Sequence, residues 1–197
     1  MRRTTLVSTL VAFALALSPL PAAAHSVVYQ ATLLGSNESP PSGSLGTGTA
    51  TVTVDFDLLT MHVQASFSDL GGNSTIAHIH CCLVSGGAPN VGVATPTPTF
   101  PGFPAGVGVT AGTYDQTFDL TAAASYNPAF VTAQGSLANA MNALLIGFDA
   151  GTTYFNIHTS TFPAGEIRGN LYAVPEPQTL ALVGLALAFV AARGRRA

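Results

Sequence analysis

The sequence contains no lysine and no tryptophan, and only 8% of its residues are charged. Between His25 and Val174 there are eight acids and a single base, Arg168, so this segment has a net charge of −7 with histidine neutral. The other five arginines lie near the two ends and mask this imbalance in the net charge of −3 for the whole chain. A body this acidic offers no positive surface to nucleic-acid phosphates. Nucleic-acid binding is therefore excluded as a class of function.

Cysteine is also scarce, and the only two are the neighbours Cys81 and Cys82. Two cysteines in an exported chain usually indicate a disulfide. However, neighbouring Cα atoms lie about 3.8 Å apart, below the roughly 4.4–6.8 Å of relaxed disulfides, and an extended segment points the two side chains to opposite faces. Three interpretations remain: separate thiols, one of them buried; a strained redox-active bridge; or soft metal ligands beside His78 and His80. We favour separate thiols and rank the bridge last.

The N-terminus has the three parts of a secretory signal peptide. Arg2 and Arg3 are basic, residues 6–17 are apolar, and small residues lead up to Ala24. We predict a signal helix within residues 1–24 and its removal after Ala24, following passage through the secretion translocon. Its apolar part is too short for a comfortable membrane span. Residues 25–173 then form one domain, long enough for a sizeable core.

The C-terminus, residues 174–197, has three parts of its own. A short motif is followed by an apolar run, which predicts a membrane helix over 179–192, and by an arginine-rich tail over 193–197. The motif consists of Val174, Pro175, Glu176 and Pro177. The order and spacing of these parts resemble the PEP-CTERM sorting tails of Gram-negative bacteria. That resemblance implies recognition by a membrane protease-like exosortase.

The basic end of this tail predicts how the chain is oriented in the membrane. Arginines remain in the cytoplasm by the positive-inside rule, which leaves the body outside. The residues that stop further export are Arg193, Arg195 and Arg196. We therefore expect a protein that is exported across the inner membrane, anchored transiently, and then released to the cell surface or the medium. The alternative is a permanent single-span anchor without cleavage.

Alternating apolar and polar residues predict a mainly antiparallel β domain. The expected strands are 27–34, 47–57, 61–67, 75–80, 114–120, 154–158 and 166–168. The second and third of these are close enough in sequence to form a hairpin. A long segment rich in glycine and proline over 85–108 predicts a functional or mobile loop; its Phe100 and Phe103 form an exposed contact or, more commonly, hold the loop against the sheet.

One helical insertion is expected over about 127–149. Asn127 is a suitable N-cap and Pro128 suits the first turn. Apolar residues then recur at the spacing of an amphipathic helix, and Gly151 ends it. These apolar residues are Leu137, Met141, Leu144, Leu145 and Phe148. We interpret this stripe as core packing.

Four short motifs in a fixed order resemble the CHRD domain, the module named after chordin. They are GSNESPP at 35–41, AHIH at 77–80, YFNIHT at 154–159 and FPAGEIRG at 162–169. The sequence departs from the family at Ser39, where an apolar residue is more usual, and at Cys81–Cys82, where many members have Gly-Pro. The resemblance covers roughly residues 28–173. It implies an immunoglobulin-like or superoxide-dismutase-like sandwich or barrel.

These motifs also hold the only concentrated polar chemistry of the domain. On an extended strand, residues two apart share a face, so His78 lies beside His80 and Glu166 beside Arg168. Arg168 is expected to pair with Glu38 or Glu166 and so to connect the first loop to the last strand. The family-signature polar cluster comprises Glu38, His78, His80, Asn156, His158, Glu166 and Arg168.

Two hypotheses describe the histidines. In the first, His78, His80 and His158 bind copper or zinc, as a store or as a redox protein of the superoxide-dismutase type. His25 would add a free amine after signal cleavage. In the second, which we favour, the histidines are neutral and bond to neighbouring groups across packed strands. An acidic body does not steer superoxide, and no catalytic triad, phosphate loop or carboxylate pair is present, so we expect no enzyme and no cofactor.

The function expected from the sequence is that of a secreted, surface-sorted CHRD protein without enzymatic activity. Its role would be binding or structure in the envelope or extracellular (biofilm) matrix. The expected partners are the exosortase-type enzyme, the translocon, the membrane before processing, and exopolysaccharide or surface proteins. The alternative remains a copper- or zinc-binding redox protein.

Overall fold

The computed structural model describes residues 25–84 and 89–175, and these residues form eight strands and two α-helices. Each of the seven predicted strands is present, with ends shifted by up to two residues, and alternating burial accompanies the predicted alternation on the early strands. The strands are β1 (Ser26–Leu34), β2 (Thr47–Asp55), β3 (Thr60–Ser68), β4 (Ser74–His80), β5 (Gly112–Asp119), β6 (Tyr154–Thr159), β7 (Ile167–Asn170) and the short β8 (Tyr172–Ala173).

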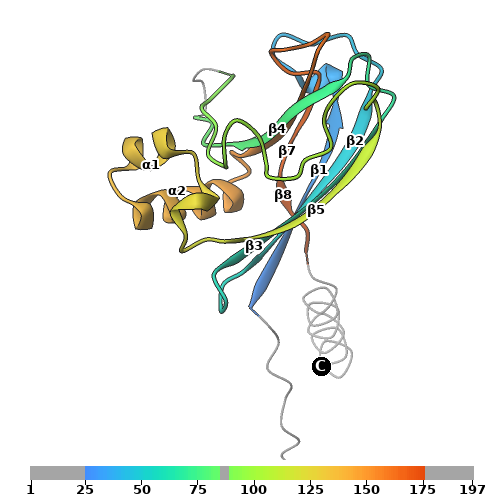
Figure 1. Cartoon of the computed structure of the whole chain (residues 1–197). Coiled ribbons are helices and arrows are strands. Elements are labelled where there is room, and N and C mark those ends of the chain that lie inside the picture. The colour runs from blue at the N-terminus through green and yellow to red at the C-terminus, as the bar shows by residue number, and fades with distance from the viewer. Residues whose placement is uncertain (1–24, 85–88, 176–197) are drawn as a thin grey trace, which may run out of the picture.

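All eight strands belong to one antiparallel sheet that curves into a half-barrel (Figure 1). The order is β4-β6-β7-β1-β2-β3-β5, with β8 pairing to β1 beyond the end of β7. The predicted β2–β3 hairpin is confirmed over its full length, from Thr47 opposite Ser68 to Asp55 opposite Thr60. The mainly antiparallel β prediction is therefore confirmed, with one curved sheet as the observed form.

The long glycine- and proline-rich segment packs along the free edge of β4. Backbone N–H groups of Ala94, Phe100 and Gly106 donate to carbonyls of β4 at distances of 2.9–3.2 Å. Phe100 is fully buried among Tyr114, Phe118 and Phe155, with ring centroids 5.5–5.7 Å apart. The aromatic residues thus hold the loop against the sheet, and the loop fills the space between the edge strands β4 and β5.

Two helices occupy the region where a single helical insertion was predicted. They are α1 (Pro128–Gln134) and α2 (Leu137–Asp149). Asn127 caps α1 as predicted, by accepting from the N–H of Ala129. The single-helix prediction was wrong at Gly135, which adopts a φ of +83° and ends α1, after which Ser136 caps α2. Glycine tolerates this left-handed conformation without strain, so the chain turns there.

The apolar stripe of α2 packs into the core beside β1. Leu144 and Phe148 are fully buried, and Phe148 stacks on Tyr29 at a centroid distance of 5.1 Å. The Tyr29 hydroxyl donates to Asp149 at the end of the helix. These contacts attach the helical insertion to the same core as the strands.

The interpretation of Cys81 and Cys82 as separate thiols was wrong, because the two residues form a disulfide with each other. The distance argument assumed a Cα spacing of about 3.8 Å, which holds for a trans peptide. The Cys81–Cys82 peptide bond is cis, and the Cα atoms are 3.0 Å apart. The two side chains also lie on the same side of the chain, since both sulfur atoms approach the Ala143 carbonyl, at 3.7 and 3.4 Å.

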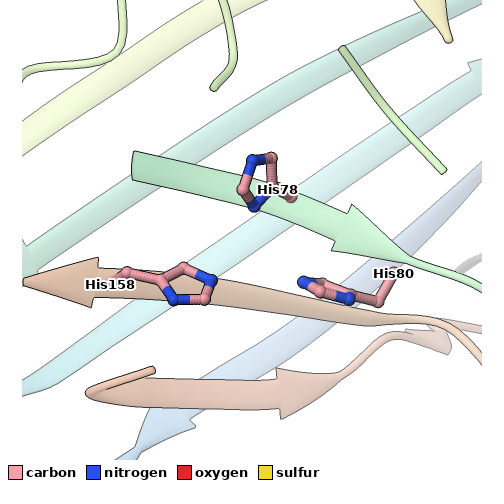
Figure 2. Close-up of side chains that lie close together, drawn as sticks. All are labelled: His78, His80 and His158. Carbon is pink, nitrogen blue, oxygen red and sulfur yellow. The ribbon is translucent and has the colours of Figure 1, made fainter. Parts of the chain in front are cut away.

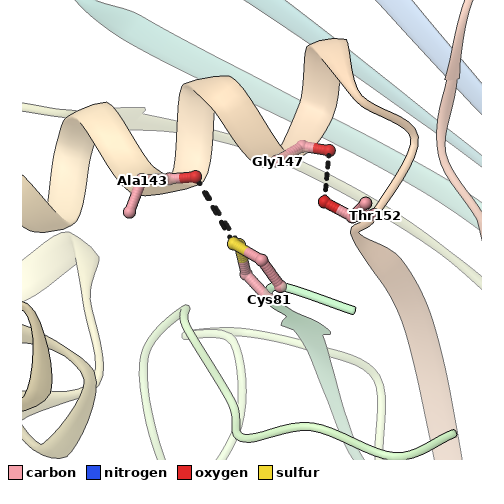
Figure 3. Close-up of a disulfide and its surroundings, with 5 residues drawn as sticks. Cys81, Ala143, Gly147 and Thr152 are labelled. Carbon is pink, nitrogen blue, oxygen red and sulfur yellow. Dashed lines mark hydrogen bonds between the residues drawn. A yellow bond between two sulfur atoms is a disulfide. The ribbon is translucent and has the colours of Figure 1, made fainter. Parts of the chain in front are cut away.

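This disulfide lies directly beneath α2 (Figure 3). Gly147 allows the close approach, because a Cβ atom there would stand 2.7 Å from the Cys81 sulfur. Thr152, just after the helix, donates to the Gly147 carbonyl at 3.2 Å. The end of β4 and the end of α2 are therefore packed in direct contact.

The predicted signal peptide and most of the sorting tail, residues 1–24 and 176–197, lie outside the described residues. The helices within residues 25–84 and 89–175 lack the length and hydropathy that a membrane span requires. The membrane helix expected over 179–192 belongs to the part that is not described.

Candidate functional site

Two neighbouring strands, β4 and β6, place most of the predicted polar residues on one face of the sheet. In the β4–β6 register, His78 lies opposite Asn156, His80 opposite Tyr154, and Ile76 opposite His158. In the β6–β7 register, Asn156 lies opposite Arg168. Because side chains alternate along each strand, the residues between them, such as Ile79 and Phe155, face the core. Polar and apolar faces are thus separated by strand geometry alone.

His78, His80 and His158 form a histidine cluster on this face (Figure 2). Their ring centroids are 5.7 Å apart for His78–His80, 5.6 Å for His78–His158 and 6.4 Å for His80–His158. One ligand atom from each ring lies within 4.8 Å of the others. His78 is only 4% exposed, and the other two are half-buried.

Each histidine uses one ring nitrogen to bond a backbone carbonyl of a covering loop. The pairs are His78 Nε2 with Pro98 O at 2.5 Å, His80 Nδ1 with Val91 O at 2.8 Å, and His158 Nδ1 with Pro163 O at 3.0 Å. A carbonyl only accepts, so each of these nitrogens must carry the proton. The second nitrogen of each neutral ring then holds a lone pair. Within the described residues these second nitrogens are buried and have no hydrogen-bond partner.

Burial keeps the three rings neutral. Desolvation lowers the pKa of His78 and His158, and it lowers the pKa of His80 to about 4. The loop carbonyls partly oppose this shift because they favour the protonated ring. At neutral pH the cluster therefore carries lone pairs and no positive charge.

Arg168 lies at the β7 end of the same face and is 8% exposed. Its Nε donates to Asn37 O at 2.6 Å, and its Nη1 donates to the Asn90 side chain at 2.6 Å. Its guanidinium carbon lies 4.7 Å from the centre of the Tyr154 ring. Arg168 thus connects three segments: the loop that follows β1, the loop that follows β4, and strand β6 itself.

Glu38 is the acid beside Arg168, at 3.8 Å from Nε, and it is 7% exposed. The Asn156 side chain donates to Glu38 at 2.6 Å. Burial raises the pKa of Glu38 to about 7, although Arg168 and Asn156 both act to lower it. Of the two partners predicted for Arg168, the structure brings Glu38 to it.

Glu166 has a separate environment, although it stands two residues from Arg168. Its carboxylate accepts from Ser44 Oγ at 2.6 Å, Gly71 N at 2.5 Å and Thr159 Oγ1 at 2.5 Å. All three donors are neutral and the side chain is fully buried. Glu166 therefore ties the β1–β2 and β3–β4 loops to β6, and it is not part of the group around the histidines.

Two other histidines lie elsewhere. His62 on β3 is half-buried and pairs with Asp115 at 2.7 Å. The backbone N–H of His25 donates to Asp57 at 3.1 Å, and its ring packs on Phe56. Neither belongs to the histidine cluster.

Tyr154 is a member of the site that the sequence analysis did not identify. Its ring stacks on His80 at 4.6 Å with an angle of 7° between the planes, and Arg168 lies over the same ring. The signal was present, because Tyr154 alternates with Asn156 and His158 on one strand. The carbonyls of Val91, Pro98 and Pro163 gave no such signal, since every residue has a carbonyl.

Comparison with protein families identifies the domain that carries this site. A family model described as the CHRD domain matches residues 29–171. The chain belongs to the CHRD domain family. The histidine cluster, Glu38, Glu166 and Arg168 all lie within its CHRD domain, as does the Cys81–Cys82 disulfide.

A second family model, the PEP-CTERM protein-sorting motif, matches residues 173–196 directly after the CHRD domain. The tail is thus of the type recognised by exosortase-type sorting machinery, which indicates export and membrane-associated processing. Comparison with curated proteins and with solved structures gave no match.

Proposed function

We propose that this CHRD protein is a non-enzymatic component of the extracellular matrix that binds a neutral polysaccharide at the cell surface. The observation that carries the proposal is an uncharged groove of about 730 Å³ on β1, β2 and β8. This volume lies within the range of about 300–1,000 Å³ that is usual for ligand pockets.

The lining of the groove suits a ligand rich in hydroxyl groups. Gln30, Asn37 and Asn170 supply amides, which both donate and accept, and Thr32 and Thr49 supply hydroxyls. Tyr172 is 61% exposed at the groove and offers an apolar ring face with a polar tip. None of the nine lining residues is charged, although the body carries a net −7. A neutral sugar chain fits this surface better than a phosphate or a cation does.

The point at which the sorting tail leaves the domain supports a role at the surface. β8 pairs with β1 at Tyr29 and Gln30, and Val174 N–H donates to Val28 O at 2.8 Å. The tail therefore leaves beside the start of β1 (Figure 1). The loop after Leu34 lies at the other end of a nine-residue strand, about 30 Å away. A protein attached through this tail would hold the Tyr172 end of the groove near the attachment point and the Asn37 end farther from it.

Affinity electrophoresis of the mature protein tests the proposal. The gel would contain host matrix polysaccharide, separated into neutral and acidic fractions. We expect the neutral fraction to retard the protein and the acidic fraction not to, because the body is acidic. Tyr172→Ala should abolish the retardation, whereas Val107→Ala, a change at a 97% exposed residue outside the groove, should not. Equal mobility of all three proteins in the neutral fraction would contradict the proposal.

A further inference from the structure

The histidine cluster has more hydrogen-bond acceptors than the described part of the chain has donors for them. The atoms without a partner among residues 25–84 and 89–175 are His78 Nδ1, His80 Nε2 and His158 Nε2. Directly across the sheet from His78, Asn156 donates its amide nitrogen to Glu38 and leaves its buried Oδ1 unpartnered within the described residues. Four of the six buried side-chain polar atoms without a partner in that part of the chain thus belong to one face of β4 and β6.

Buried acceptors without partners are satisfied only when a hydrogen-bond donor or a cation binds beside them. Buried polar groups in folded proteins are almost always satisfied. A water molecule donates only two hydrogen bonds, so one water does not satisfy four acceptors. A metal ion, in contrast, takes lone pairs from several imidazoles at once.

We propose that the histidine cluster binds a late first-row transition-metal ion, preferably copper, through His78 Nδ1, His80 Nε2 and His158 Nε2. This site goes beyond the polysaccharide role proposed above and does not depend on it. The donor atoms come from adjacent antiparallel strands, so the sheet itself holds them together. Figure 2 shows His80 and His158 directing ring nitrogens toward each other, with His78 above the space between them.

The spacing of the rings fits one ion. With metal–nitrogen distances of about 2.0–2.1 Å and tetrahedral to trigonal ligand angles, imidazoles that share an ion have ring centroids about 5.2–5.5 Å apart. The observed separations of 5.6, 5.7 and 6.4 Å are within about 1 Å of this range. Binding one ion would therefore draw the rings closer together, by up to about 1 Å for the His80–His158 pair.

The groups around the three histidines are also arranged as they are around metal-bound histidines. Metal-bound histidines usually donate their other N–H to a carbonyl or carboxylate, which sets the tautomer and the ring orientation. All three histidines do so, to Val91, Pro98 and Pro163. Tyr154 restrains the His80 ring further by stacking on it. The arrangement thus fixes the lone pairs in the direction of the cluster centre.

The donor set selects the class of ion. Three imidazoles, with no carboxylate in the group, do not suit calcium or magnesium, which prefer oxygen ligands. Imidazole suits copper, zinc, nickel and iron, and among divalent ions copper forms the most stable complexes. Cys81 and Cys82 supply no thiolate because they are bonded to each other. Copper is therefore expected to bind most tightly, with zinc as the weaker alternative.

Metal analysis of the mature protein tests the site directly. The protein would be stripped with a chelator, incubated with copper(II) or zinc(II), desalted and measured by mass spectrometry of the metals. We expect about one copper per chain and a higher melting temperature in the loaded form, since a ligand that binds only the folded state stabilises it. With both metals present, copper should displace zinc. Single variants His80→Ala and His158→Ala should each lose the copper and the thermal shift.

Two matched controls separate this site from other histidines. His62→Ala removes a half-buried histidine on β3 that pairs with Asp115, outside the cluster, and this variant should keep the copper. His25→Ala removes an imidazole that would lie beside a new terminal amine after cleavage at Ala24. This variant should also keep the copper. Loss of copper in His25→Ala with retention in His158→Ala would place the metal at the N-terminus and overturn the proposal. Copper well below one per chain in the folded parent protein would overturn it as well.

Discussion

Arg168 is the single base between His25 and Val174, and it is buried at the junction of three segments. Sequence reasoning expected it to pair with an acid and to connect the first loop to the last strand. Glu38 does lie beside Arg168. The shorter contacts of Arg168, both 2.6 Å, are however with Asn37 O and the Asn90 side chain. At the scale of one residue, a buried guanidinium is held by several oxygens, because a single partner would leave donors unsatisfied.

We predict that Arg168→Ala destabilises the domain strongly. It removes a buried charge and leaves Glu38 without its cation, a kind of change that typically costs about 3–5 kcal/mol. For a domain of this size the melting temperature should fall by on the order of 10 °C, measured by circular dichroism. Arg168→Lys keeps the charge but loses the planar fork and should recover only part of the loss. A shift of about a degree in Arg168→Ala, no larger than that of an ordinary surface change, would show that these contacts contribute little.

The residues of the candidate site were partly predictable, for a physical reason. His78, His80, Asn156 and His158 share a face because strand side chains alternate, and alternation is visible in sequence. That the unprotonated nitrogens point to one another depends on loop carbonyls from distant segments. No local pattern encodes those partners.

At the scale of elements, α2 and the end of β4 form a tight contact that depends on one glycine. Gly147 faces the Cys81–Cys82 disulfide, and a Cβ there would lie 2.7 Å from one sulfur and 2.9 Å from the other. It would also lie 3.0 Å from a methyl carbon of Thr153. Helical propensity alone would favour alanine at this position. The packing contact, and not the helix, therefore requires glycine.

We predict that Gly147→Ala lowers stability, against its helix propensity. Overpacking of a close-packed contact typically costs about 1–3 kcal/mol, more than the gain of roughly 1 kcal/mol from propensity. Chemical denaturation should show a lower midpoint for Gly147→Ala. Asn142→Ala, at an exposed position of the same helix, serves as the control and should be neutral or slightly stabilising. An unchanged or higher midpoint in Gly147→Ala would mean that α2 can move away from the disulfide at no cost.

At the scale of the whole molecule, the domain and its sorting tail are joined without a linker. The CHRD match ends at residue 171 and the PEP-CTERM match begins at 173. β8, which lies at this junction, is still part of the sheet. An enzyme that recognises this motif would therefore act close to the folded body.

We predict that replacing Pro175, Glu176 and Pro177 by alanine blocks processing. Proline favours extended backbone and a glutamate is disfavoured in hydrocarbon, and both properties suit a motif presented to a protease-like enzyme at the outer face. In a host with an exosortase, the parent protein should leave the membrane fraction and lose its arginine tail. The variant should remain membrane-bound with the tail intact, as judged by mass spectrometry of the C-terminus. A parent protein that keeps Arg193, Arg195 and Arg196 at the cell surface would support a simple anchor instead.

The sequence by itself determined the family, the positions of the strands and the sorting motif at the C-terminus. These features depend on contiguous residues or on the alternation of side chains along a strand. Such local patterns can be read from the sequence without knowing which residues are in contact. The tertiary structure alone decided the Cys81–Cys82 bond, the break between α1 and α2, and the convergence of three imidazole nitrogens. Each depends on backbone conformation or on groups far apart in the chain, such as Pro163 beside His158 or Val91 beside His80. Local periodicity says which face a side chain occupies, whereas only packing sets which atoms meet there.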